Sequence, residues 1–259
     1  MTDLVDVATP RMDPRIRERR VAVKRDEGRR RLRLLMAGVG ALAVGAVVYA
    51  VLRSPLLDVD TIRVRGAANT TPAEVATAGG LDRHPQLVDL DSAKVATRIE
   101  SLPWVQRATV ARRWPGTVEV TLLERTPLAA VPGDGGWAMV DATGRVLEVA
   151  AEAPAGMPTI TTPVAAPPPG SRVSTSTRGG LLVLQSLPGS LTTRILGIDV
   201  DDQGGLQLRL DGAPTVRFGP PTSVRPKLVA VATLLSRTNL RGVTSVDVRV
   251  PTAPVLTRT

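Results

Sequence analysis

The only side chain in this sequence that ordinarily gains and loses a proton near neutral pH is His84. Cysteine is absent, which removes thiolate nucleophiles, disulfides and zinc sites of the cysteine type. A Ser-His-Asp triad or a histidine-based metal site would therefore have to use His84, which stands beside Pro85 in an expected loop. No G-x-S-x-G elbow, phosphate-binding loop, dinucleotide fingerprint or H-E-x-x-H segment occurs. The sequence predicts no catalytic residue, no bound cofactor and no metal site, and it assigns His84 to a solvated loop.

Two glutamates and two tryptophans are the next candidates for a functional role. The odd spacing of Glu119 and Glu124 turns their side chains to opposite faces of an expected strand, so they cannot act together as an acid and a base. Trp104 and Trp114 flank an expected hairpin, where packing at the edge of a core is favoured over anchoring a partner. The pair Arg112-Arg113 could bind an acidic partner, but a solvated rim is the favoured interpretation.

The strand expected at Ser245 to Val250 differs from these features because its backbone could bind another chain. It is limited by Pro251 and followed by a Pro-containing tail, which predicts a position at a sheet edge. An open edge can accept an incoming strand, with backbone groups supplying affinity and with Arg249 and Ser245 selecting side chains. The alternative is an edge that the tail of the chain itself caps, and these residues alone do not decide between the two.

An uncharged segment near the N-terminus predicts a membrane anchor. The 19 residues from Leu34 to Leu52 carry no charge, and a helix of this length spans about 28 Å, which matches the bilayer core. Residues 15–33 contain ten Arg or Lys, whereas the 15 residues after Leu52 contain three, so the N-terminus is expected in the cytosol. A signal peptide cleaved after Val48-Tyr49-Ala50 is the alternative, although its apolar region would be too long.

The charge and composition narrow the class of protein. The formal charge is +9, and residues 1–33 supply +5 of it with 11 basic and 6 acidic residues. The remaining residues are nearly balanced, at 22 basic and 18 acidic, so binding of nucleic acid is a minor alternative to membrane topology. Hydrophobic residues make up 43% and aromatic residues 2%, which predicts an aliphatic core and no deep ligand cavity.

The first external region shows the order β-α-α-β-β. A capping box at Thr71-Pro72-Ala73-Glu74 begins one helix, and Gly79-Gly80 ends it. A second helix has an expected N-cap at Leu90-Asp91-Ser92, carries Val95, Ile99 and Leu102 on one face and ends at Pro103. The strands are expected at 59–64, 104–112 and 117–124.

The second external region alternates short strands with two helices. Between its two halves, Ala150 to Thr175 contains six prolines and is expected to be an irregular crossing. The helices are expected at 178–187 and 224–235. The strands are expected at 128–131, 137–140, 145–149, 195–200, 206–210, 216–218 and 245–250.

Several of these residues resemble a known family. Leu102-Pro103-Trp104-Val105 is followed by Ala108-x-Val110-x-Arg112-x-Trp114-Pro115-x-Thr117 and by Glu124-Arg125-x-Pro127. This cluster resembles the polypeptide-transport-associated (POTRA) domain of the FtsQ/DivIB family of bacterial cell-division proteins. Further residues match the β-domain of that family, namely Phe218-Gly219, Lys227 and Val246-Asp247-Val248-Arg249.

The resemblance implies an α+β protein with a single transmembrane helix. Its expected parts are a basic cytoplasmic tail at 1–33, the helix at 34–52, a POTRA domain at 55–125 and a mainly antiparallel β-domain with flanking helices at 126–259, which includes the Pro-rich crossing at 150–175. The resemblance also implies a single-pass protein of the plasma membrane whose C-terminal part lies outside the cytoplasm at the division septum.

The function implied by the resemblance is that of a cell-division scaffold. It would recruit partners of the FtsB/DivIC and FtsL type and link the early divisome to septal peptidoglycan synthesis, without a small-molecule substrate and without nucleic acid. In this family the last strand is the docking edge, which favours as partner-binding residues Ser245, Val246, Asp247, Val248, Arg249 and Val250.

Two other classes of function stay open. A POTRA module could serve polypeptide translocation, although such proteins usually repeat the module and continue into a membrane barrel. A membrane-anchored cell-wall hydrolase is the enzymatic alternative, and it would depend on His84.

Overall fold

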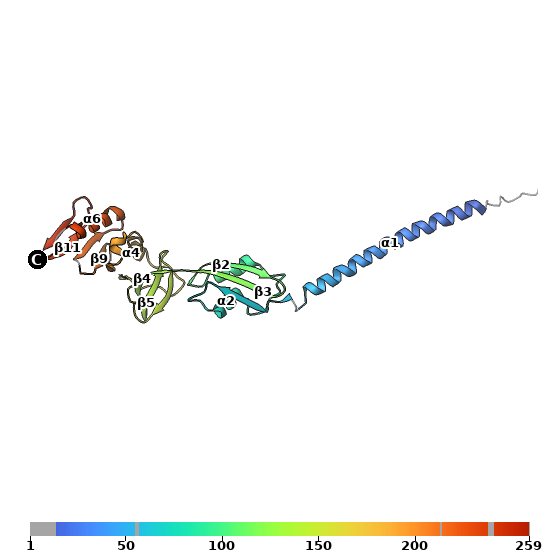
Figure 1. Ribbon diagram of the computed structural model, residues 1–259, viewed down its shortest axis with the longest axis horizontal. Coiled ribbons are helices and arrows are strands. Elements are labelled where there is room, and N and C mark those ends of the chain that lie inside the picture. Colours follow the sequence, from blue (N-terminus) through green and yellow to red (C-terminus); the bar gives the residue numbers. More distant parts are fainter. Residues whose placement is uncertain (1–13, 55–56, 213, 238–240, 259) are drawn as a thin grey trace, which may run out of the picture. The chain divides into compact units, whose positions relative to one another are not determined.

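The computed structural model describes residues 14–54, 57–212, 214–237 and 241–258, without the side chains of residues 14–31, 52 and 237. The chain divides into two compact units, Met1–Asp58 and Val59–Thr259 (Figure 1). The first part of the expected basic tail, residues 1–13, lies outside the described residues.

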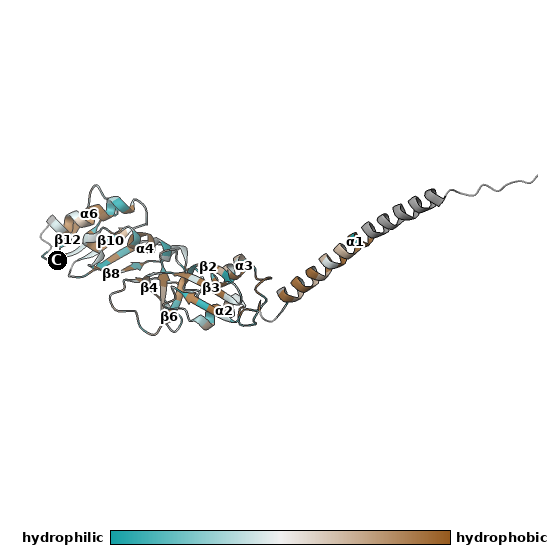
Figure 2. Cartoon of the chain, turned by 45° about the vertical axis from the view of Figure 1, so that its right-hand side comes forward, coloured by the Kyte–Doolittle hydropathy of each residue, from teal (hydrophilic) through white to brown (hydrophobic). Residues whose placement is uncertain are grey.

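The first unit is one long helix, α1 (Pro14–Leu52). Its apolar part, Leu32–Val51, is long and apolar enough to cross a membrane, and none of it is buried inside the protein (Figure 2). The expected span at 34–52 falls on this stretch. The helix also continues back through the basic segment to Pro14, because Arg, Lys, Glu and Ala are good helix formers.

The second unit begins with the expected β-α-α-β-β order. Its elements are β1 (Thr61–Arg65), α2 (Pro72–Gly79), α3 (Ser92–Ile99), β2 (Val105–Arg113) and β3 (Thr117–Glu124). The strand order is β1-β3-β2, with β1 parallel and β2 antiparallel to β3. Residues on one face of this sheet pack with α2 and α3 into an aliphatic core that includes Val75, Ile99 and Val120. The mixed α+β architecture is therefore confirmed for this part of the chain.

Local hydrogen bonds explain where the two helices begin. At α2 the Thr71 hydroxyl accepts from the Glu74 amide at 3.2 Å, and the Glu74 carboxylate accepts from the Thr71 amide at 2.7 Å. Gly80 ends α2 in the left-handed conformation, with φ +67°. At α3 the Asp91 carboxylate accepts from the amides of Ala93 and Lys94. Both predicted caps are confirmed.

A larger sheet follows, and in the described residues it has nine strands. Their order is β12-β11-β10-β9-β8-β7-β4-β5-β6. The strands are β4 (Pro127–Gly133), β5 (Gly136–Asp141), β6 (Val146–Ala150), β7 (Thr159–Thr161), β8 (Ile195–Val200), β9 (Leu206–Leu210), β10 (Thr215–Gly219), β11 (Val243–Asp247) and β12 (Val255–Arg258). The helices are α4 (Thr175–Gln185), α5 (Gly189–Thr192) and α6 (Val224–Arg237).

The helices of this part share one core with the sheet. Leu181 of α4 and Leu228 of α6 pack with inward-facing strand residues such as Ile198, Leu208 and Val216. The intervening residues of these strands, for example Gln207 and Arg217, are exposed on the other face. In β8 to β10 the sheet therefore has one apolar face under helices and one polar face toward solvent, whereas β4 and β5 bury residues on both faces, for example Ala129 and Ala130.

The Pro-rich crossing is more ordered than the sequence predicts. Its residues Thr159–Thr161 form β7, which pairs in parallel with β4 on one side and with β8 on the other. Ile160 is fully buried, and Gly180 of α4 leaves room for it, since a Cβ there would lie 3.2 Å from the Ile160 side chain. A strand of three residues between Pro158 and Pro163 is too short to show an alternating pattern, which is why the sequence does not predict it.

The expected last strand at Ser245 to Val250 is wrong in its bounds and in its position. β11 ends at Asp247, and β12 runs antiparallel along it, with Ser245 opposite Thr257 and Val246 opposite Leu256. The chain reverses after Val250, whose carbonyl accepts from the Ala253 amide at 3.1 Å. The tail of the chain thus covers β11, which matches the alternative interpretation, and the outermost strand is β12.

The helices of the second half differ from expectation at their ends. α4 begins at Thr175, three residues before the expected start, because the Ser174 hydroxyl caps the Thr177 amide. The short helix α5 was not expected, since its four residues follow Pro188 directly and carry no periodic pattern.

Candidate partner-binding edge

The outer edge of the nine-stranded sheet is β12, a strand of four residues. β11 lies on one side of it, and no other described strand pairs with its second side. Val255 is 60% exposed and Val250, in the turn before it, is 58% exposed. An open strand edge beside exposed aliphatic side chains can accept an extended segment of another chain.

The six residues that the sequence singles out fall into three environments. Val246 and Val248 are buried in the core, so their side chains cannot reach a partner. Ser245 and Asp247 are half-buried, whereas Arg249 and Val250 are exposed in the turn after β11. Their predicted role in binding stays a prediction, and the residues that form the actual edge, Val255 to Arg258, were not singled out from the sequence.

Asp247 and Arg249 form a compact ion pair at the end of β11. The guanidinium of Arg249 lies 2.7 Å from the Asp247 carboxylate, and the Arg249 amide donates to the same carboxylate at 3.0 Å. Hydrogen bonds from Arg249 lower the pKa of Asp247, and the carboxylate in turn raises the pKa of Arg249. Both groups therefore stay charged near neutral pH, and the backbone at this turn is tied to the pair.

A buried lysine supports the neighbouring turn, which follows β10. Lys227 of α6 is almost completely buried, donates from Nζ to the Pro220 carbonyl at 2.9 Å and lies 5.0 Å from the centre of the Phe218 ring. Burial lowers the pKa of Lys227, while the charge of Asp247 acts in the opposite direction. The buried ammonium thus fixes the turn that follows β10.

Gly219 connects this turn to the ion pair. It has φ +71°, and a Cβ at this position would lie 2.9 Å from Cγ of Arg249. Gly219, Lys227 and the pair Asp247–Arg249 therefore form one cluster, hereafter the turn cluster. The sequence marks these positions only through the family resemblance, and their contact in space was missed because they come from three separate elements.

The outer face beside β12 carries charges of both signs. Arg217 of β10 stands opposite Asp247 in register, and a hollow of about 200 Å³ lies between Arg217, Arg249, Gly219 and Asp201. Arg258 is exposed on β12 itself. Near the hollow, Arg217 and Arg249 are balanced by Asp201 and Asp247. Arg258, at the other end of β12 in register, is the arginine that could meet an acidic side chain of an incoming segment.

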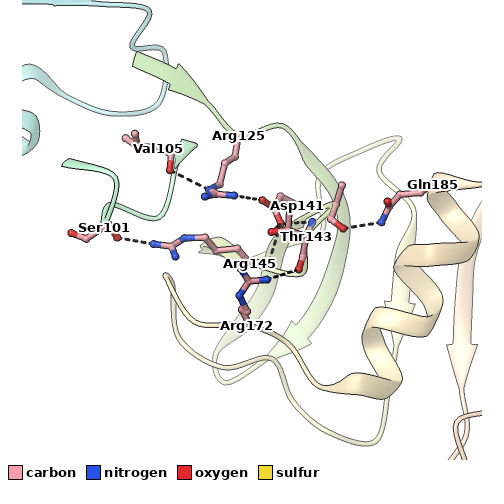
Figure 3. A network of polar contacts seen from close by, with 9 residues as sticks. Ser101, Val105, Arg125, Asp141, Thr143, Arg145, Arg172 and Gln185 are labelled. Carbon is pink, nitrogen blue, oxygen red and sulfur yellow. Dashed lines mark hydrogen bonds and ion pairs between the residues drawn. The ribbon is translucent and has the colours of Figure 1, made fainter. Parts of the chain in front are cut away.

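A second polar cluster joins the two sheets of the second unit (Figure 3). Arg125, in the connection between β3 and β4, donates to the Val105 carbonyl at 3.2 Å and to the Asp141 carboxylate at 2.8 Å. Arg145 donates to the Ser101 carbonyl at 2.7 Å. We call Arg125, Asp141 and Arg145 the junction cluster, because their bonds cross from the three-stranded sheet to the nine-stranded sheet.

Asp141 is the centre of the junction cluster. Burial by itself would raise the pKa of this carboxyl, but hydrogen bonds from Arg125, the Arg145 amide and Thr143 outweigh burial and lower it. The carboxylate oxygens accept from Thr143 N and Oγ1, both at 2.8 Å, and from the Arg145 amide at 2.9 Å. The junction therefore depends on a charged, buried and fully bonded aspartate.

The remaining candidate residues have structural partners. His84 is exposed, and its Nδ1 lies 2.7 Å from the Val59 carbonyl. Glu119 pairs with Arg65 and Arg113, whereas Glu124 accepts from Asn69 and Thr70, so the two glutamates do not converge. Among the described residues no group of three His, Asp or Glu side chains is arranged to hold a metal ion.

The two tryptophans differ from each other. Trp104 is half-buried and donates to Glu148 at 3.1 Å, again between the two sheets. Trp114 is 55% exposed at the hairpin between β2 and β3. The expected place at the edge of the core is therefore wrong for Trp114.

Comparisons with known proteins agree with this architecture. The family described as "POTRA domain, FtsQ-type" matches residues 57–125, and the family described as "Cell division protein FtsQ/DivIB, C-terminal" matches residues 129–249. The chain is similar to cell division protein FtsQ of Streptomyces bingchenggensis, with 29% identity over 89% of this chain and 90% of the relative. It is also similar to FtsQ of Corynebacterium glutamicum, with 26% identity over 80% of this chain and 91% of the relative.

Replacing Asp141 by asparagine should destabilise the protein in a pH-dependent way. The pKa of Asp141 is lower in the folded state, so its contribution to stability is present above the ordinary aspartate pKa and is lost as pH falls through the folded value. We expect Asp141→Asn to lose about 3 kcal/mol at pH 7, because Arg125 is left without its buried partner. This difference from the unsubstituted protein should shrink below about pH 4.

The measurement is urea unfolding of the detergent-solubilised protein at several pH values, followed by tryptophan fluorescence. Asp202→Asn, in the exposed turn between β8 and β9, is the matched control and should change the unfolding free energy by less than about 0.5 kcal/mol. A difference between Asp141→Asn and the unsubstituted protein that is the same at pH 7 and pH 3.5 would contradict the assignment.

Proposed function

The chain belongs to the FtsQ/DivIB family of bacterial cell-division proteins, and from this premise we propose that it acts at the division septum as a scaffold without a catalytic step. The observation that carries the proposal is the pair of consecutive family matches over residues 57–249, behind a helix suited to cross a membrane. The protein would recruit division proteins of the FtsB/DivIC and FtsL type and so connect the early divisome to septal peptidoglycan synthesis.

We assign separate roles to the parts of the chain. Residues 55–125 would form a POTRA module that helps to localise the protein, and residues 126–259 would form the β-domain that captures the partner. The junction cluster supports this division of roles, because it couples the two modules through charged hydrogen bonds. A partner held at β12 would then be kept in a defined relation to the POTRA module.

The docking mode that the edge supports is addition of a strand. An extended partner segment would pair with the backbone of β12 and place aliphatic side chains against Val250 and Val255. An acidic side chain of the segment would meet Arg258, which is exposed on β12 itself. A four-residue strand offers few backbone hydrogen bonds, so the side-chain contacts must supply much of the selectivity. The turn cluster would hold Arg249 in place beside this segment.

Depletion of the protein tests the division role. Cells that lose it should grow into filaments, because septal synthesis would no longer be connected to the early divisome, and a fluorescent fusion should gather at midcell before constriction. Light microscopy of a depletion strain measures both effects. Normal division during depletion, or a fusion spread evenly over the membrane, would reject the proposal.

Deleting residues 251–259 tests the docking edge. This change removes β12 and leaves β11 as the outer strand, so capture of a purified FtsB/DivIC-type partner should fall by at least tenfold if the partner pairs with β12. Surface-bound partner and the full-length protein in detergent are suitable for the measurement. Unchanged capture would exclude β12 as the docking edge. Stronger capture would show that β12 competes with the partner for β11.

A matched pair of glycine variants tests the turn cluster without removing a strand. Gly219 and Gly204 both have positive φ, at +71° and +79°, but an added Cβ contacts Arg249 only at Gly219. Each change to alanine should cost about 1–2 kcal/mol of stability from the backbone alone. Only Gly219→Ala should also weaken partner capture, and equal capture by both variants would exclude a role for the turn cluster.

We also propose that the N-terminus is cytosolic and that residues after Arg53 lie outside the cytoplasm. The support is the bias of ten basic residues before the span against three after it. Protease added to intact spheroplasts should remove an epitope at the C-terminus and spare one at the N-terminus. Protection of the C-terminal epitope until the membrane is permeabilised would show that the orientation is the opposite of the proposed one.

A further inference from the structure

The three-stranded sheet has one face that none of the described elements covers. Val118, Val120 and Leu122 of β3 turn inward toward α2 and α3, so the alternate residues of the three strands face away from the helices. We call this outward surface the open face. Its charged residues, placed by the strand register, are Arg63, Arg65, Arg107, Arg113 and Glu119.

The open face is strongly basic. Four arginines against one glutamate give it a charge of +3. Glu119 is shared between Arg65 at 2.9 Å and Arg113 at 3.1 Å. The side chains of Arg63 and Arg107 are exposed, and neither has a hydrogen bond or an ion pair with another described residue. Two guanidinium groups are therefore available for an anionic ligand. Because Arg65 and Arg113 share the single negative charge of Glu119, these three residues together keep one further positive charge.

The rest of the open face is polar and contains little apolar surface. The uncharged residues between the arginines are mostly threonines, including Thr109 and Thr121, and Leu123 at the far end is 56% exposed. A protein partner normally requires a cluster of buried apolar contacts at the centre of the interface. Attachment to a charged membrane surface needs no such cluster, since arginine binds phosphate groups through charge and paired hydrogen bonds.

An exposed tryptophan marks the end of the sheet where the chain arrives from α1. The amides of Asp60 and Thr61 both donate to the Gly116 carbonyl, at 2.9 and 3.1 Å, so the hairpin that carries Trp114 lies beside the start of β1. The eight residue steps from Leu52 to Asp60 can span no more than about 28 Å. Tryptophan is enriched at the membrane interface, where its ring lies at the level of the headgroups.

From these observations we propose that the open face of the three-stranded sheet binds the anionic headgroups of phospholipids, with Arg63 and Arg107 as the principal contacts and Trp114 inserted at the interface. The inference goes beyond the scaffold role, because it concerns a surface of the three-stranded sheet, whereas β12 belongs to the nine-stranded sheet. Docking on lipid would restrict how far the POTRA module can tilt on its short connection to the membrane.

The test uses the full-length protein reconstituted into nanodiscs. Because the chain has no cysteine, Thr121→Cys provides a single site on the open face for a fluorophore, and Thr97→Cys on α3 provides the control site on the helical side. The nanodiscs contain phosphatidylcholine alone or with about one third phosphatidylglycerol, together with a trace of lipid that carries a quencher on its headgroup. We expect at least twofold stronger quenching at position 121 with phosphatidylglycerol, and no such change at position 97.

Two sets of variants identify the cause. Arg63→Gln/Arg107→Gln should shift the balance between docked and undocked protein by roughly 25-fold, at about fivefold for each arginine near an anionic surface. Arg178→Gln/Arg225→Gln removes the same charge from exposed sites on α4 and α6 and should leave the quenching unchanged. Raising the salt to 1 M, where the Debye length is about 3 Å, should weaken docking by screening the arginines. Trp114→Ser should weaken docking both at low salt and in 1 M salt.

Two results would overturn the proposal. One is equal quenching at position 121 in the two lipid mixtures. The other is binding of a polyglutamate peptide to the open face in an Arg63- and Arg107-dependent manner while the lipid gives no quenching, which would identify an acidic protein as the ligand. Neither result affects the scaffold role, which is measured separately by partner capture at β12.

Discussion

The buried contact between Arg125 and Asp141 is the interaction on which the arrangement of the second unit depends. The two sheets have separate aliphatic cores, so apolar burial stabilises each sheet but contributes little to the position of one against the other. Charged hydrogen bonds have a defined geometry, and a buried charge that loses its partner is costly. The junction cluster, with Trp104 bonded to Glu148 beside it, therefore gives the connection a preferred geometry that a flexible linker would lack.

The short strand β7 has a comparable role inside the nine-stranded sheet. Strands β4 to β6 on one side of it are antiparallel, and so are strands β8 to β10 on the other side. β7 joins these two segments through parallel pairs with β4 and β8. Ile160 of β7 packs against Gly180 of α4, so α4 covers the apolar face of the sheet at the place where the two segments meet. One continuous sheet thus extends from β6, near the junction cluster, to β12 at the outer edge.

The sequence predicts the parts of the fold that have a local cause. The capping box of α2, the N-cap of α3, and the alternating strands β2, β3, β8 and β9 depend on neighbouring residues and could be read directly. β7, β12 and the exposure of Trp114 could not, because each depends on contacts with distant segments. The candidate edge is a further example. The sequence indicates residues near the edge, but only the structure shows that the tail of the chain covers β11.

The shortness of β12 has a consequence for specificity. A long, flat edge would pair with many extended chains, whereas four residues between a Pro-containing turn and the C-terminus provide too few backbone bonds for strong pairing without matching side chains. Arg249 is already paired with Asp247, so discrimination at the proposed edge would come mainly from Arg258, which would repel a basic segment. Affinity and selectivity at the proposed edge would therefore come from different groups. The buried ammonium of Lys227 fixes the turn on which Arg249 packs.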